Sequence, residues 1–548
     1  MSGTSKHLPY IFLIVIATIS LALKLSVFNV GAPYVTIDDN TLFNAGFIVW
    51  FGEAPPQRMY LESWVAGAVS IATYITNLLL TGNIDQISIN VVADAYRDFV
   101  GNPDPYVANY RASMLLADFT TALLVFFLAK QLFQNTSHQT WLAAYASSLF
   151  LFSYNTLWCY LVARPDTLTS LFAVLGMYFY YKSDFGEQKK YLLLSAIGLG
   201  CATGLKLHAA LFVVFLCLDL IREQGLKKSF SQVSLLASAS FFTFMIVAGS
   251  PLFDPLLYVK LRMLNIKDDE SPWIEWGDQI ATQFEGTGWL ISPLVLLGTV
   301  YVFLQRKINI PPKIKSILFV SCLFILFFLS IRQLRSYWML PALPLIYISG
   351  VYLLSRVNQT LIKYTIGCIL GVIFFFQIFQ QSHQFDNSRY DELQSWVQEN
   401  TSPTDVIYTI GFDTLFLPCN TTCLQNRRKS LEKSITSAQQ SQENFTSRHV
   451  RLWEERAQLK LIDMLDTRFA TGFNYYNLNT APLTFLSPNV TYDDIKIVLA
   501  MQGYYTPEAE NLLQKVQRDF SKVGVANSPG GKAGTGGLPY DIYVRKNQ

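Results

Sequence analysis

The chain has 548 residues, of which 51% are hydrophobic and 15% are charged, and its formal net charge is +3. Soluble chains carry about a quarter charged residues, so this composition excludes an ordinary soluble protein and predicts a polytopic membrane protein. The small net charge and the lack of any dense Lys/Arg block argue against a nucleic-acid partner.

An apolar run over residues 8–30 opens the chain and follows Lys6 and His7. It is longer than the core of a signal peptide and lacks a cleavage site of small residues, which predicts a retained membrane anchor. Further apolar stretches of spanning length follow, and about eleven spans are expected in all. These stretches are 112–133, 140–160, 168–181, 191–203, 207–221, 233–250, 289–304, 314–331, 337–354 and 361–379.

Residues 64–80 are apolar too, but acidic stretches flank them and an additional span would invert the topology. We therefore expect a juxtamembrane helix that lies in the membrane interface. It belongs to the first outer loop, residues 31–111, in a membrane region that extends over residues 1–380.

Every second predicted loop is basic, and short basic loops stay in the cytoplasm. The N-terminus is therefore expected inside, whereas the first outer loop, the acidic loop around residues 267–270 and the region after about residue 380 face outward. The inner loops carry Lys130 and His138, then Lys182, Lys189 and Lys190, then Arg222, Lys227 and Lys228, then Arg306, Lys307, Lys313 and Lys315, and finally Arg356 and Lys363.

Residues 381–548 are polar and predict a soluble, extracytoplasmic α/β domain. Strand-like segments cover 406–410, 495–499 and 540–544, a helical pattern covers 448–466, and a Gly-rich turn covers 528–537. The Gln/Ser-rich segment 430–444 is compatible with a helix or a mobile insertion.

Five of the seven cysteines fall in or beside apolar segments, whereas Cys419 and Cys423 lie in the polar region. Outside the cytoplasm these two could form a short-loop disulfide or remain free thiols. The chain contains no Walker loop, no zinc-ligand spacing and no Gly-x-Ser-x-Gly elbow.

Asp38 and Asp39 lie within about ten residues of a predicted membrane boundary, where a charge is retained if it meets water, a cation or a reacting group. They are the first candidates for chemistry. Asp-Asp-Asn also suits a loop turn or a helix N-cap. Two adjacent carboxylates could hold a divalent cation.

Other charges are expected on the same side of the membrane. Asp166, after Arg164 and Pro165, would lie at the positive end of a helix dipole, although Pro followed by Asp also suits any helix start. Lys206 could simply extend to the interface, and His208 could be an interior histidine.

Arg332 and Arg335 could anchor a helix at anionic headgroups. Glu53, Arg58 and Glu62 of the first outer loop could line a cleft or form a solvated face.

Carboxylates beside outer-leaflet cations suit a sugar donor linked to a lipid phosphate. An aspartate can accept the proton of an attacking hydroxyl, while Arg or Lys stabilises the departing phosphate.

The segments TIDDN, PPQRMYLESW, ARPDTLTSLF, TGLKLHAALF and LRSYWMLPALPLIYISG occur in this order. They resemble the GT-C superfamily of polytopic glycosyltransferases, in the branch with protein O-mannosyltransferases and lipid A aminoarabinose transferases. The resemblance implies a mostly α, GT-C-like membrane region. It implies a multi-pass protein of the plasma membrane, namely the bacterial inner membrane. It implies that Asp38 or Asp39 acts as the base and that Asp166 is a second carboxylate.

By the same resemblance, Arg332, Arg335, Lys206 and Arg164 would contact the donor phosphate, and Glu53, Arg58, Glu62 and His208 would line the cleft. No cofactor is expected. The His-Pro-Pro-Leu-Gly-Lys string of protein mannosyltransferases is replaced by Ala54-Pro55-Pro56-Gln57-Arg58, so a protein acceptor is not implied.

The leading hypothesis is an inverting hexosyl- or pentosyltransferase. It would use a polyprenyl-phosphate sugar and a lipid, glycan or protein acceptor at the outer membrane face, among membrane lipids. The alternative is a transporter or flippase of lipid-linked or amphipathic substrates, with buried charges along its path. The expected clustering of charges at one face favours the enzyme.

Overall fold

The computed structural model describes residues 7–28, 37–50, 60–83, 85, 87–88, 90–134, 136, 138–161, 164–248, 280, 290–304, 310–330, 336–357, 360–384, 392–410, 420–440, 445–465, 474–477, 491–502, 507–526 and 540–546. The chain divides into two compact units. The first unit comprises Met1–Ser26, Met59–Leu61 and Ala112–His383; the second comprises Val27–Arg58, Glu62–Arg111 and Gln384–Gln548.

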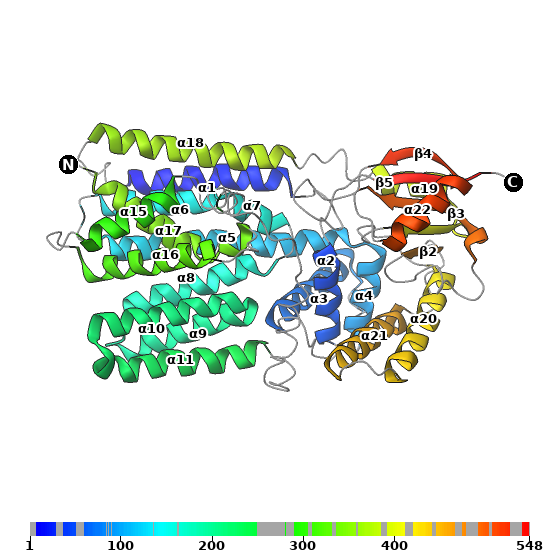
Figure 1. The fold of residues 1–548 in the computed structure, drawn as a ribbon, viewed down its shortest axis with the longest axis horizontal. Helices are drawn as coiled ribbons and strands as arrows, with labels where there is room; N and C mark the ends of the chain where they lie inside the picture. Colours follow the sequence, from blue (N-terminus) through cyan, green and yellow to red (C-terminus); the bar gives the residue numbers. More distant parts are fainter. Residues whose placement is uncertain are drawn as a thin grey trace. The chain divides into compact units, whose positions relative to one another are not determined.

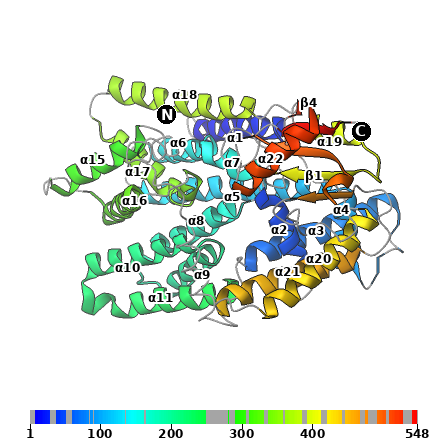
Figure 2. The same cartoon turned by 45° about the vertical axis from the view of Figure 1, so that its right-hand side comes forward.

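The first unit is a helical assembly, and each predicted apolar stretch contains α-helix. Its helices are α1 (Leu8–Ser26), α5 (Asp104–Leu132, from Ala112 onward), α6 (Gln139–Leu151), α7 (Tyr154–Leu161), α8 (Asp166–Lys182), α9 (Lys189–Leu205), α10 (Ala210–Gln224), α11 (Leu226–Ala248), α15 (Ile291–Leu304), α16 (Pro312–Ser330), α17 (Leu343–Ser355) and α18 (Thr360–Gln384). Short 3-10 turns, η3 (Leu207–Ala209) and η4 (Ser336–Met339), precede α10 and α17. Figures 1 and 2 show α9, α10 and α11 side by side.

Five described helices are long and apolar enough to cross a membrane by length and composition. They include α3 (Tyr60–Thr81) from its second residue onward, so the expected interfacial position of residues 64–80 stays a prediction. The total of eleven spans stays a prediction too. The fold class, a mostly α polytopic membrane protein with a small α/β part, is confirmed.

The expected span 140–160 is not one helix, because α6 ends at Leu151 and α7 begins at Tyr154. At this break the N–H of Ser153 donates to the carbonyl of Phe150, and the hydroxyl of Thr156 donates to the carbonyl of Ser153 at 2.8 Å. Polar side chains that bond locally to the backbone compete with the helical ladder. The break leads directly to the segment that carries Arg164 and Asp166.

Hydrogen bonds and ion pairs join helix ends that the topology places on the inner side. Lys130 Nζ at the end of α5 donates to the Tyr10 hydroxyl near the start of α1 at 2.9 Å. Lys313 near the start of α16 lies 3.0 Å from Asp184, which follows α8. These two contacts join helix ends that the loop charges predict on the same side, while the remaining topology and the orientation across the membrane stay predictions.

The second unit contains the outer-loop helices α2 (Ile37–Trp50), α3 and α4 (Val91–Gly101) together with the C-terminal elements. These are α19 (Glu392–Asn400), β1 (Val406–Ile410), α20 (Thr421–Gln440), α21 (Phe445–Leu465), β2 (Asn474–Asn477), η8 (Tyr492–Asp494), β3 (Ile495–Met501), α22 (Pro507–Asp519), β4 (Phe520–Ala526) and β5 (Tyr540–Arg545). The three predicted strands are confirmed, whereas β2 and β4 were not predicted. The Gly-rich turn 528–537 and the loop around 267–270 lie outside the described residues.

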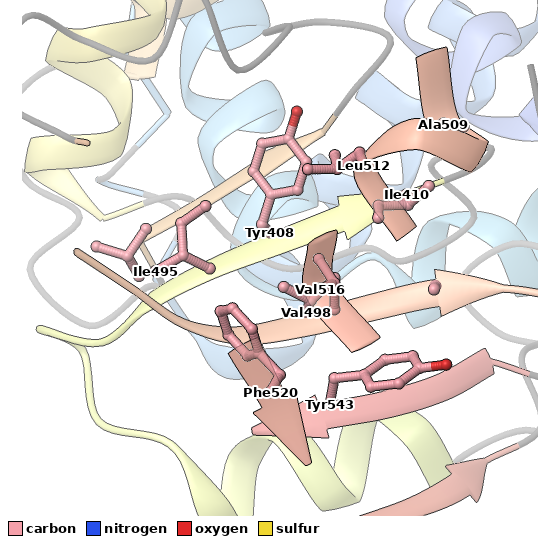
Figure 3. Close-up of a cluster of buried hydrophobic side chains, with 11 residues drawn as sticks. Tyr408, Ile410, Ile495, Val498, Ala509, Leu512, Val516, Phe520 and Tyr543 are labelled. Atoms are coloured by element: carbon pink, nitrogen blue, oxygen red, sulfur yellow. The ribbon is translucent and has the colours of Figure 1, made fainter. Parts of the chain in front are cut away.

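The five strands form one sheet in the order β2-β1-β3-β5-β4. Strand β1 pairs in parallel with β2 and β3, whereas β5 pairs antiparallel with β3 and β4. Alternate strand residues, among them Tyr408, Val498 and Tyr543, form a buried cluster with Leu512 and Val516 of α22. Figure 3 shows these helix and strand side chains packed together. This apolar face is the core of the α/β part.

The Gln/Ser-rich segment is helical up to Gln440, where α20 ends. Asn420 caps α20, because its side-chain oxygen accepts a hydrogen bond from the N–H of Cys423 at 2.9 Å. Cys423 is disulfide-bonded, which contradicts two free thiols, and Cys419 lies outside the described residues.

Candidate active site

Asp166 and Lys206 form an ion pair at adjacent helix ends of the first unit. Helix α8 begins at Asp166, directly after Pro165. Lys206 follows the last residue of α9 and caps its C-terminus in an extended backbone conformation. The Lys206 Nζ lies 3.3 Å from the Asp166 Oδ2. The predicted position of Asp166 in the first turn of a helix is therefore confirmed.

The Asp166 side chain is fully buried, yet within the described part of the chain neither of its oxygens accepts a hydrogen bond. It therefore does not act as a backbone cap, the alternative that its position at a helix start had suggested. The Asp166 side chain lies at the positive end of the α8 dipole and beside Lys206, which is 21% exposed.

Arg164 lies two residues before Asp166 and is 9% exposed. The buried thiol of Cys159 on α7 lies within electrostatic range of Arg164, Asp166, Lys206 and Asp118. These charges therefore share one neighbourhood, although they come from four segments of the first unit. The arrangement brings together the predicted second carboxylate and two of the four predicted phosphate-binding cations.

His208 follows Lys206 in η3 and stacks on Trp338 of η4, with ring centroids 6.1 Å apart and an interplanar angle of 20°. A hydrogen bond also joins it to the backbone of Trp338. The His208 Nε2 is buried and makes no hydrogen bond within the described residues. An imidazole held in this way presents one ring nitrogen to a polar ligand.

Lys24 and Asp118 form an ion pair that the sequence reasoning missed. The Lys24 Nζ on α1 donates to the Asp118 Oδ2 on α5 at 3.0 Å, and both side chains are fully buried. The signal was available, because each residue is a single charge inside an apolar segment of spanning length. Which charge meets which depends on helix packing, which a single sequence does not reveal.

The predicted base lies in the second unit. Helix α2 includes Asp38 and Asp39 in its first turn, and their side chains lie outside the described part of the structure. Arg332, Arg335, Glu53 and Arg58 also lie outside the described residues. Their predicted roles stay predictions.

Glu62, at the start of α3, is 8% exposed and so does not belong to a solvated face.

Helix α2 crosses α3 at very close range. A Cβ atom added at Gly46 would lie 2.7 Å from the backbone nitrogen of Gly67, so only glycine permits this crossing. The ring nitrogen of Trp50 donates to the carbonyl of Trp64 at 3.0 Å, and the two rings stack with centroids 5.3 Å apart.

Aromatic contacts also hold α2 against α4 and α5. Phe43 and Phe47 each pack against Phe99 of α4, with centroids 5.2 and 5.5 Å apart. Phe43 also meets Tyr110 edge-on at 5.6 Å. All four rings are buried, so the helix that carries Asp38 and Asp39 is held rigidly from within its own unit.

No group of three or more His, Cys, Asp or Glu side chains that could hold a metal ion occurs among the described residues. The divalent cation considered at Asp38 and Asp39 would bind side chains that lie outside the described part of the structure, so this site stays a prediction.

No protein-family model matches the chain, and no curated protein matches it. Among solved structures, ArnT from Cupriavidus metallidurans in the apo state matches with a TM-score of 0.47 and 9% identity, over 98% of this chain and 99% of that chain. The structure of ArnT from the same organism bound to undecaprenyl phosphate matches with a TM-score of 0.43, 9% identity and the same coverage.

Proposed function

We propose that this chain is an inverting glycosyltransferase of the GT-C type that takes a sugar from a polyprenyl-phosphate donor. The observation that carries the proposal is the ion pair of the fully buried Asp166 with Lys206, beside Arg164, at helix ends that the loop charges predict on the outer side. Buried ionisable groups in membrane helices are costly and usually functional.

In the proposed reaction, an acceptor hydroxyl attacks the anomeric carbon of the donor. The bond between that carbon and the phosphate oxygen breaks, and the proton of the hydroxyl passes to the carboxylate of Asp38 or Asp39. The polyprenyl phosphate leaves with an additional negative charge. Lys206, Arg164, Arg332 and Arg335 are the cations proposed to stabilise that charge.

The pairing with Asp166 gives Lys206 a defined place before the donor arrives. A Lys side chain loses considerable rotamer freedom when it is fixed, and the ion pair imposes this cost in advance. We infer that Asp166 orients Lys206 toward the leaving phosphate rather than acting as the base itself. The buried Nε2 of His208, which makes no hydrogen bond within the described residues, is proposed to bind a hydroxyl of the sugar.

The acceptor is proposed to be a lipid or a glycan at the outer face of a bacterial inner membrane, where the second unit is expected to lie. A protein acceptor is the third possibility.

The test replaces Asp38 and Asp39 by Asn, singly and together, in the purified full-length chain. Labelled undecaprenyl-phosphate hexoses and pentoses serve as donors, and lipid extracts and glycans serve as acceptors. At least one single variant is expected to lose about 10²- to 10⁴-fold in turnover, the contribution of general-base catalysis. Full transfer by the double variant would contradict a carboxylate base.

A transporter or flippase remains a second candidate because buried charge is not confined to one face. Asp219 is fully buried near the inner end of α10, where it accepts a hydrogen bond from Tyr180 at 2.9 Å and pairs with Arg222 at 2.7 Å. The expected clustering at one face is therefore only part of the pattern. Movement of labelled lipid between leaflets of sealed vesicles, with its sugar linkage intact, would support this candidate.

A further inference from the structure

We propose that Lys24 and Asp118 are positioning residues for sugar transfer, which hold the α6–α7 segment that leads to Asp166. The inference rests on the proposed function and adds to it a pair of residues remote from the reacting atoms.

The pair is costly to keep. Both of its side chains, Lys24 and Asp118, are fully buried. Burying two charges costs more than their attraction returns in many proteins, and apolar replacements of similar volume are often equally stable or better. Stability alone therefore does not explain why Lys24 and Asp118 occupy this place.

Each partner also lies one helical turn from a hydrogen bond that joins its own helix to α6. On α1, Ser20 precedes Lys24 by four residues, and its hydroxyl donates to the carbonyl of Leu151, the last residue of α6, at 3.1 Å. On α5, Ala122 follows Asp118 by four residues, and its carbonyl accepts a hydrogen bond from the Ser147 hydroxyl at 2.7 Å. Residues four apart share a helix face.

These three links join α1, α5 and α6 immediately before the break at Phe152 and Ser153. We call the Lys24–Asp118, Ser20–Leu151 and Ser147–Ala122 contacts the brace. The brace fixes the point from which α7 starts.

Helix α7 carries the effect to the site. Its buried Cys159 thiol interacts electrostatically with Asp118 and also with Asp166, Arg164 and Lys206. The carboxylate of Asp166 accepts no hydrogen bond within the described residues. Its position therefore depends on the backbone at the start of α8 and on Lys206, and a shift of α7 would move it.

The decisive variant is the double replacement Lys24→Met with Asp118→Leu, which removes both charges and leaves apolar side chains. It is expected to unfold at the wild-type temperature or above, while its kcat falls about 10- to 100-fold because the site is misaligned. Binding of undecaprenyl phosphate and the donor KM should stay near wild type. If the pair serves the structure alone, the kcat of the folded double variant stays at the wild-type value.

Two single variants that change no charge test the proposal if the double variant does not fold. Ser20→Ala removes one link of the brace, whereas Ser321→Ala removes a buried hydroxyl contact with Ser349, 2.8 Å long, between α16 and α17. Both should lower the melting temperature alike, and only Ser20→Ala should lower kcat. Equal kcat in Ser20→Ala, Ser321→Ala and wild type would overturn the inference, as would wild-type kcat in the folded double variant.

The two proposals fail in different ways. If the wild-type chain transfers sugar from none of the undecaprenyl-phosphate donors, the proposed function itself is wrong. If the wild type transfers sugar and the brace variants match its kcat, the function stands and the positioning role falls.

Discussion

The Nζ atom of Lys206 lies 3.3 Å from Oδ2 of Asp166, so a cation expected to meet a donor phosphate is held in advance by a buried carboxylate. The pair joins the start of α8 to the end of α9. In the proposed reaction these two side chains act as one unit. Their replacement should therefore give strongly non-additive losses.

Asp166→Asn and Lys206→Met should each lower turnover about 100-fold, the usual effect of removing one group that stabilises transition-state charge. The double variant should be no slower than the slower single variant, because a pair that works as a unit is lost with its first member. Steady-state kinetics with a labelled undecaprenyl-phosphate sugar measures this.

The matched control is Asp219→Asn, which removes another fully buried, ion-paired carboxylate of the first unit. It should lower thermal stability and leave turnover unchanged. Additive losses for Asp166 and Lys206 would show that the two side chains act independently.

Gly46→Ala should displace α2 from α3, since the added Cβ would lie 2.7 Å from the Gly67 backbone nitrogen. Overpacking of this kind costs about 1–3 kcal/mol. Because α2 carries Asp38 and Asp39, turnover should fall as well. Gly371→Ala on α18 is the control, as its added Cβ meets nothing within 4 Å. Wild-type turnover in a folded Gly46→Ala variant would mean that the position of α2 is not critical.

The first-unit helices could be predicted well from sequence because apolar runs of spanning length permit few other structures. The failure at α6 and α7 has a local cause, the backbone bonding of Ser153 and Thr156, which an apolar pattern does not reveal. Strand β4 was missed for a different reason: the exposed residues in its middle give no alternation of apolar and polar side chains.

The candidate site could be predicted only one residue at a time. The position of Asp166 at a helix start follows from Pro165 and is local. Its pairing with Lys206, and that of Lys24 with Asp118, joins residues 40 and 94 positions apart. Such pairings depend on which helices pack together, so they became visible only in the structure.

Asn420→Ala should destabilise the α/β part by about 1 kcal/mol, the usual cost of losing an N-cap. The cap bonds the N–H of Cys423, and the Asn420 amide also donates to the carbonyl of Pro403 at 2.7 Å. Thermal unfolding of the full chain in detergent measures the loss. Thr422→Ala, exposed in the same helical turn, should change little. Equal stability of both variants would contradict a capping role.

Acid should weaken the α/β part through Asp405. Burial raises the pKa of this carboxyl, but the N–H of Ser402 and the ammonium of Lys496, 2.9 Å away, outweigh it and hold the pKa below its usual value. The resulting stabilisation is therefore present above about pH 4, the unfolded-state pKa, and is lost as the pH falls through the lower folded-state pKa.

Lys496→Met should remove part of this stabilisation at neutral pH, by no more than about 1 kcal/mol because such partly exposed pairs are weak. The difference from wild type should vanish in acid, where Asp405 is protonated. Calorimetric unfolding between neutral and acidic pH compares the stability of this variant with that of the wild type. A difference that persists unchanged in acid would mean that Lys496 acts through packing.

The most direct test of the account is a single product analysis with the purified wild-type chain, an undecaprenyl-phosphate sugar of known anomeric configuration, and lipid extracts and glycans as acceptors. Mass spectrometry and NMR would follow the lipid and the sugar together. The account predicts free undecaprenyl phosphate and a glycosylated acceptor in equal amounts, with the anomeric configuration inverted. A donor that is recovered chemically intact, or a product that retains the configuration, would contradict it.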